Sequence, residues 1–150
     1  MASDTATLSD AFGNLSATPA ISLRGGNAAD DCLPVPPFDP MLDEITPQYF
    51  EMYFCGIPHL DAESWRYYLP HFLRYALDNI TNPASNAIDA ILYSLRPPDR
   101  DPPRFRALTP TQEAAVAGAL DQLAFSDHST WKEPAMIALE EYWGLGATYR

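Results

Sequence analysis

The residues with the clearest chemical potential lie in one stretch of the chain. Cys55, His59, Asp61 and Glu63 are close in sequence, and His71 follows on the next predicted helix. A structural zinc site needs cysteine or histidine pairs at short, regular spacing, and a metalloprotease site needs the pattern HExxH. The sequence contains neither pattern. We therefore predict no metal site and no cofactor.

Other catalytic patterns are equally hard to find. The chain has no G-x-S-x-G elbow and no phosphate-binding loop, and Gly25-Gly26 stands alone. Adjacent carboxylates occur at Asp30-Asp31, Asp43-Glu44 and Glu140-Glu141. Neighbouring positions on a helix diverge by about 100°, so these pairs are predicted to be solvated charge rather than an acid/base pair. We predict that the protein is not an enzyme. A small enzyme with an unrecognised cleft, joining His59, Cys55 and carboxylates, is the alternative.

Composition excludes further classes of protein. The 150 residues are 47% hydrophobic, enough for one domain with its own core. Nine Lys and Arg against twenty Asp and Glu give a net charge of −11, which disfavours nucleic-acid binding. No apolar run approaches the roughly 20 residues that span a bilayer, and the start lacks the pattern of a Sec signal. We expect a cytoplasmic protein with Cys32 and Cys55 as buried free thiols, a disulfide between them being the alternative.

The N-terminal quarter differs from the rest. Residues 1–37 are rich in small and polar residues, and four prolines between positions 33 and 40 exclude a helix there. We therefore divide the chain into an irregular or mobile N-terminal arm, 1–37, and a helical domain, 38–150. Leu15, Ile21 and Leu33 are the candidates for packing the arm onto the domain, and a disordered tail is the alternative.

Helix signals dominate after residue 40. Thr46, Asp61, Ser85 (or Asn86) and Thr109 are candidate N-caps. The second helix has apolar residues at a period of 3.6, and Pro70 should kink or split it. No alternation of period two indicates strands. The fold class is all-α: a compact single-domain bundle of about five helices.

Surface candidates lie on that second helix and before it. Tyr67, His71 and Tyr75 recur every four residues, offset from the apolar stripe, as an interaction face or, as we favour, a second core face. Net charge is uneven, being −9 over residues 1–63, +2 over 64–106 and −4 over 107–150. Such an imbalance accelerates encounter with a basic partner, although acidity for solubility alone is the simpler explanation.

Three motifs carry a resemblance. Residues 65–72 read WRYYLPHF, residues 105–112 read FRALTPTQ, and residues 138–143 read ALEEYW. These motifs resemble the signatures of a small bacterial family of unknown function, over about residues 47–144. The resemblance implies a shared fold and no activity, and the linker at 96–104 is expected to be an exposed proline-rich loop.

The chain is also similar in character to immunity proteins, which block a toxic effector. This similarity implies a protein partner with a basic surface, bound through charged residues and a few aromatics. The predicted partner-binding residues are Asp43, Glu44, Glu51, Asp61, Glu63, Tyr67 and His71. The alternative to an immunity protein is an adaptor that binds through the linker 96–104.

Overall fold

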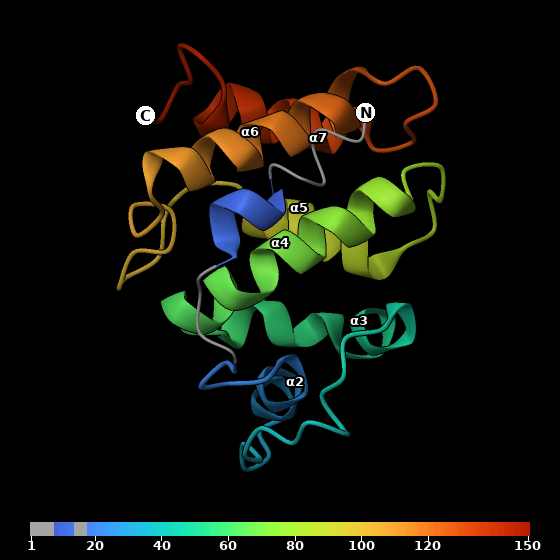
Figure 1. Ribbon diagram of the computed structural model, residues 1–150, viewed down its shortest axis with the longest axis vertical. Helices are drawn as coiled ribbons and strands as arrows, with labels where there is room; N and C mark the ends of the chain where they lie inside the picture. The colour runs from blue at the N-terminus through green and yellow to red at the C-terminus, as the bar shows by residue number, and fades with distance from the viewer. Residues whose placement is uncertain (1–7, 14–17) are drawn as a thin grey trace.

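Helices pair in three tiers along the long axis of the molecule (Figure 1). The computed structural model describes residues 8–13 and 18–150. From the top of the view, the pairs are α6 (Pro110–Phe125) with α7 (Lys132–Ala138), α4 (Ala62–Asp78) with α5 (Asn86–Ser94), and α3 (Pro47–Tyr53) with α2 (Leu23–Asp30). A 3-10 helix, η1 (Phe54–His59), follows α3, and a π-helical turn, η2 (Leu139–Trp143), follows α7. The described residues contain no strand, and with the short helical turn at residues 8–12 they form seven α-helices rather than about five.

The predicted N-caps are confirmed. The side chains of Thr46, Asp61 and Ser85 each accept a hydrogen bond from the backbone N–H three residues on, at 3.0 Å. Thr109 and Gln112 form the full capping box, with reciprocal bonds of 3.0 and 3.1 Å. Each cap stabilises its helix by about 1 kcal/mol, which explains why these helix starts could be located from the sequence.

The central helix α4 is continuous through Pro70. Of the two expected outcomes, a kink or a split, the split does not occur. Buried packing outweighs the lost hydrogen bond. Trp65, Tyr68, Phe72 and Leu73 are all fully buried. Burying each large side chain contributes about 1.5–3 kcal/mol, against about 3 kcal/mol for a proline inside a helix.

The N-terminal segment is not irregular throughout, and this corrects our expectation for residues 1–37. Helix α2 lies within it, capped by Ser22, and packs directly on the backbone of η1. A Cβ atom added to Gly26 would overlap the Gly56 carbonyl oxygen, and one on Gly56 would overlap the Leu23 carbonyl oxygen. Only glycine permits so close an approach. Leu33, by contrast, is 59% exposed, and Leu15 lies outside the described residues.

A helical turn at residues 8–12 lies across α4 and beside α6 (Figure 1). Its side chains Leu8 and Phe12 are buried in the core. The Arg74 Nη2 donates to the Ser9 hydroxyl at 2.9 Å, and the Gln112 Nε2 donates to the Ala11 carbonyl at 3.2 Å. The start of the chain is therefore joined to two helices that are distant in sequence.

The expectations for the two cysteines and for loop 96–104 are each confirmed only in part. Cys32 and Cys55 are free, as expected, but both are exposed rather than buried. Loop 96–104 is irregular as expected, yet Arg104 is buried. In the described part of the chain, no helix has the length and apolarity needed to cross a membrane.

Candidate functional site

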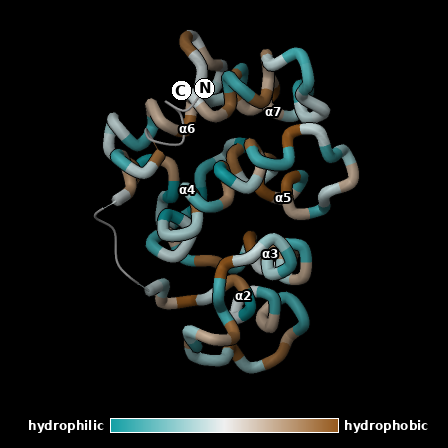
Figure 2. The backbone as a smooth tube through the Cα atoms, turned by 45° about the vertical axis from the view of Figure 1, so that its right-hand side comes forward, coloured by the Kyte–Doolittle hydropathy of each residue, from teal (hydrophilic) through white to brown (hydrophobic). Residues whose placement is uncertain are grey.

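A proline-rich loop at the foot of the molecule exposes large apolar side chains. This foot loop, residues 32–45, connects α2 to α3 and lies beside α2 in Figures 1 and 2. Met41 is 87% exposed, Leu33 and Leu42 are each 59% exposed, and Val35 is 49% exposed. Exposed apolar residues scattered singly are ordinary, but several in one short segment mark an interaction site. The foot loop is therefore the strongest candidate for a binding surface in the described structure.

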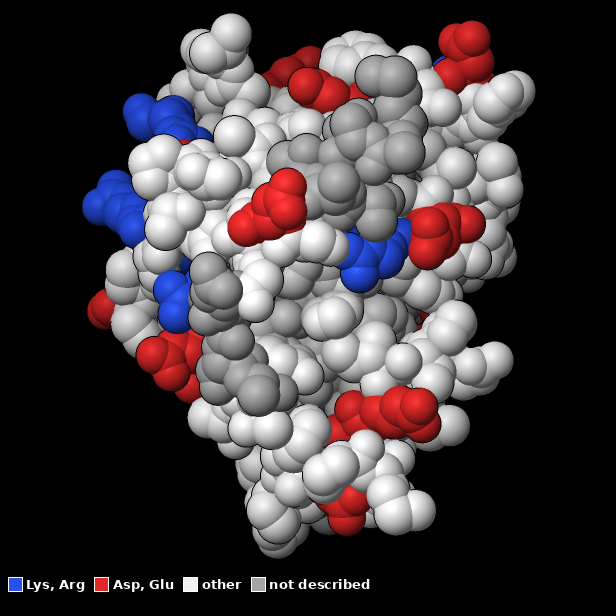
Figure 3. All heavy atoms as spheres, in the orientation of Figure 1, with Lys and Arg blue, Asp and Glu red and all other residues white. Residues whose placement is uncertain are grey.

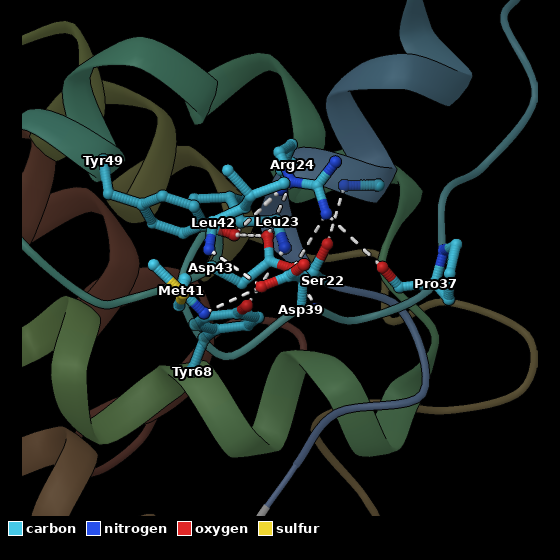
Figure 4. A network of polar contacts seen from close by, with 11 residues as sticks. Ser22, Leu23, Arg24, Pro37, Asp39, Met41, Leu42, Asp43, Tyr49 and Tyr68 are labelled. Carbon is cyan, nitrogen blue, oxygen red and sulfur yellow. Dashed lines mark hydrogen bonds and ion pairs between the residues drawn. The ribbon is translucent and has the colours of Figure 1, made fainter.

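A buried ion pair holds this loop in place (Figure 4). The Asp43 carboxylate is fully buried and accepts hydrogen bonds from Arg24 Nε at 3.0 Å and Arg24 Nη2 at 3.1 Å. It also accepts the Asp39 backbone N–H and the Tyr49 hydroxyl, each at 2.8 Å. Arg24 Nη2 reaches the Pro37 carbonyl at 3.3 Å as well. One carboxylate and one guanidinium thus tie α2, the loop and α3 together.

The ionisation of Asp43 follows from these contacts. Burial alone would raise the pKa of the carboxyl group, but the hydrogen bonds from Arg24, Asp39 and Tyr49 outweigh it and hold the pKa below its ordinary value. The same pairing raises the pKa of the Arg24 guanidinium. Both groups are charged at neutral pH, so the loop is held by a permanent ion pair.

A tight turn displays the tip of the loop. The Asp39 Oδ1 accepts the backbone N–H groups of Met41 at 2.8 Å and Leu42 at 3.2 Å. The Asp43 N–H in turn donates to the Asp39 carbonyl at 2.8 Å. The backbone of the turn is satisfied internally, and the side chains of Met41 and Leu42 are left facing solvent.

Two tyrosines complete the support by satisfying the first N–H groups of α2. The Tyr68 hydroxyl accepts the Leu23 N–H at 3.1 Å, and the Tyr49 hydroxyl accepts the Arg24 N–H at 3.0 Å. Burial raises the pKa of both phenols, so they remain neutral. Because Tyr68 belongs to the central helix, α2 is linked directly to the core, and the loop is linked to it through Arg24.

Exposed carboxylates flank the loop in sequence. Asp30 and Asp31 precede it and Glu44 lies near its end, all three exposed. The Asp30 carboxylate lies 2.9 Å from the His59 Nε2. On the face drawn in Figure 3, the acidic groups are separated by neutral surface, and basic groups gather at the left edge. On this face the acidity is therefore local to several places rather than one continuous patch.

The structure separates the seven residues predicted to bind a partner. Glu44, Asp61 and Glu63 are exposed, and Asp61 also caps α4. Asp43 is buried and paired with Arg24, so its carboxylate does not lie at the surface as the prediction assumed. Glu51 is also engaged internally. Its carboxylate accepts the hydroxyls of Tyr75 and Ser85 at 2.5 Å and the Ala87 N–H at 3.1 Å.

Tyr67 and His71 lie elsewhere, on α4. Both are half-buried and line a cavity of about 250 Å³ beneath Leu8 and Phe12. Burial, and then the charge of Arg74, lowers the pKa of His71, which keeps the imidazole neutral. These two side chains do not share a surface with the foot loop, since the N-terminal turn covers them.

The foot-loop residues were missed by sequence reasoning. The available signal was the segment LPVPPFDPML, in which prolines prevent a helix or a central strand. Apolar residues that cannot enter a regular element have no simple route to the core. The segment could therefore have been identified as an exposed apolar loop.

The residues that the structure describes form a small all-helical domain. A family model matches residues 4–145, and the chain belongs to that family of unknown function, DUF6714. The match starts well before residue 47 and includes the N-terminal segment that the three motifs left outside. No curated protein and no solved structure matches the chain.

Proposed function

We propose that this protein is a protein-binding domain that neutralises a toxic effector by covering its active surface with the foot loop. The observation that carries the proposal is the exposure of Met41, Leu42, Leu33 and Val35 on a loop held by a buried ion pair. A loop that is already ordered loses little conformational entropy when it binds. Rigid exposed apolar groups are thus suited to act as anchors in a partner's pocket.

The chemistry of the loop supports a particular kind of partner. Apolar anchors require a hydrophobic pocket, and the flanking carboxylates of Asp30, Asp31 and Glu44 favour a rim of Lys and Arg around that pocket. Effectors that attack nucleic acid carry such basic surfaces, because they bind phosphate. The carboxylates would accelerate association, and the buried apolar contacts would slow dissociation.

Capture with matched variants tests the proposal. Tagged wild-type protein, a Met41→Ser/Leu42→Ser variant and a Phe125→Ser control are used to capture partners from lysate of the native cells. Phe125 is 65% exposed, between the values for Leu42 and Met41, but it lies at the end of α6. We expect one stoichiometric partner with the wild type and the control, and its loss with the loop variant.

The captured partner then decides the function. Produced alone in a test host it should arrest growth, and co-production of the wild type should restore growth where the loop variant does not. A harmless partner would indicate an adaptor instead. A partner retained by the loop variant but lost after changes in residues 96–104 would place the interface on the other proline-rich loop and overturn the assignment.

A further inference from the structure

A large cavity lies against the other proline-rich loop. It has a volume of about 750 Å³, within the usual range of small-molecule sites, and is bounded by loop residues 97–106, η2 and Tyr149. We call it the arginine cavity. Its lining combines two exposed guanidiniums, Arg100 and Arg106, with the exposed ring of Tyr149. Tyr142 also lines it, but its ring is buried and the Arg150 guanidinium lies 4.6 Å from the ring centre. None of these residues belongs to the foot loop.

The cavity wall is held rigidly. The Asp99 carboxylate accepts four backbone N–H groups, from Arg100 and Arg104 at 2.8 Å, Phe105 at 3.0 Å and Arg106 at 3.1 Å. Arg104 is buried and donates to the carbonyls of Ile57 and Leu60, while its guanidinium lies 5.7 Å from the Trp65 ring centre. The loop is ordered before any ligand arrives, which reduces the entropy lost on binding.

Some charged side chains of the lining have hydrogen-bond partners within the protein, and others have none among the described residues. Glu141 forms a bidentate pair with Arg96, at 2.6 and 3.1 Å, and Asp99 is occupied by the backbone. The side chains of Arg100, Arg106 and Asp101 form no hydrogen bond or ion pair with the described residues. Two guanidiniums and one carboxylate in the lining of this cavity are therefore available to bind a ligand.

We propose that the arginine cavity binds a mononucleotide. A nucleotide presents the three groups that this lining complements: a phosphate for Arg100 and Arg106, hydroxyl donors for Asp101, and a heteroaromatic ring for Tyr149. The lining is not basic overall, because it holds Asp99, Asp101 and Glu141 beside Arg100 and Arg106, with Glu141 neutralised by Arg96. The attraction for a phosphate therefore depends on the two unpaired guanidiniums. More distant carboxylates are screened over about 8 Å at physiological ionic strength.

Equilibrium binding of AMP to the full chain tests this proposal, with adenosine, inorganic phosphate and phosphotyrosine as comparison ligands. We expect saturable binding of AMP, and weaker binding of adenosine and of phosphate, because each lacks one of the two recognised parts. Arg100→Gln and Arg106→Gln should each weaken AMP binding roughly tenfold or more, since each removes a charge-assisted hydrogen bond. Lys132→Gln, which removes an exposed cation at the start of α7, is the matched control and should leave it unchanged.

The aromatic wall is tested separately. Tyr149→Leu should weaken AMP binding by roughly fivefold or more, whereas Tyr149→Phe, which keeps the ring, should bind as the wild type does. Tyr149 is 65% exposed, so neither variant should impair folding. No saturable AMP binding at millimolar concentration, equal affinity for AMP and phosphate, or preference for phosphotyrosine would each overturn the nucleotide assignment. None of these results depends on the foot loop, so the proposed function is tested independently.

Discussion

Two proline-rich loops at different places in the molecule are held by related devices with different exposed chemistry. The foot loop is tied by the Asp43 carboxylate, which collects four donors, and by Arg24. Loop 96–106 is tied by the Asp99 carboxylate, which also collects four donors, and by the buried Arg104. One loop then exposes apolar side chains, and the other exposes guanidiniums beside a cavity.

The two arginines differ in how their charge is compensated. Arg24 pairs directly with a carboxylate, whereas Arg104 donates to backbone carbonyls. Burial, and then the neighbouring charge of Arg100, lowers the pKa of the Arg104 guanidinium to about 10, so it is still charged at neutral pH. The comparison teaches that each loop combines one carboxylate with one arginine, but only in the foot loop do the two pair with each other; Arg104 is instead held by backbone carbonyls.

Removing the buried guanidinium should have the largest effect. Arg104→Ala leaves carbonyls of η1 and Leu60 without donors and a void beside Trp65, so we expect a loss of about 4 kcal/mol in the free energy of unfolding. Urea denaturation measures it. The exposed neighbour Arg100→Ala should change stability by less than about 0.5 kcal/mol. Equal effects at the two positions would contradict the structural role of Arg104.

Removing the foot-loop carboxylate should have the next largest effect. Asp43→Ala leaves Arg24 and the Tyr49 hydroxyl without their acceptor, and we expect a loss of about 2 kcal/mol, because Arg24 is partly exposed and can be solvated. Limited proteolysis should then cut within residues 32–45 and spare residues 96–106. The control Asp31→Ala removes an exposed carboxylate and should leave the cleavage pattern unchanged.

Lowering the pH should reduce the difference in stability between the wild type and a variant that lacks the Asp43 carboxylate. Hydrogen bonds overcome burial and hold the pKa of Asp43 below 3.8 and that of Glu51 below 4.5, so at acid pH the unfolded chain binds more protons than the folded one. The stabilisation is fully present above about pH 5 and is lost as pH falls through the lowered pKa values. In Asp43→Asn the Asp43 contribution is absent, whereas those of Glu51 and of Glu141, whose pKa the Arg96 hydrogen bond lowers, remain. Its stability should therefore fall less than that of the wild type between pH 5 and pH 3, as measured by thermal unfolding. Parallel curves would show that Asp43 does not titrate as described.

The exposed tip of the foot loop should have the smallest effect on folding. Leu42→Ser alters a side chain that is 59% exposed, and we expect a change of less than about 0.5 kcal/mol in thermal unfolding. A loss above 1 kcal/mol would mean that the tip contributes to the core. The loop would then be a structural element rather than a binding surface.

Local signals in the sequence predicted local structure well. Thr46, Asp61, Ser85 and Thr109 located four helices because a capping side chain acts within three residues of its own position. The burial of Asp43 could not be found in this way, since Arg24 lies 19 residues away and the pairing depends on how α2 packs. Helix α2 itself was missed because its two glycines, Gly25 and Gly26, disfavour a helix. In the folded protein Gly26 allows the close approach of α2 to Gly56, which the local sequence does not reveal.

The docking of residues 8–12 has a consequence for the order in which the molecule is completed during synthesis. Helix α2 meets η1 about 30 residues later, so this contact can form while most of the chain is still unmade. The turn at 8–12 must instead wait for Gln112, 101 residues after Ala11, before its hydrogen bond to α6 exists. The first described segment of the chain is therefore among the last to find its place.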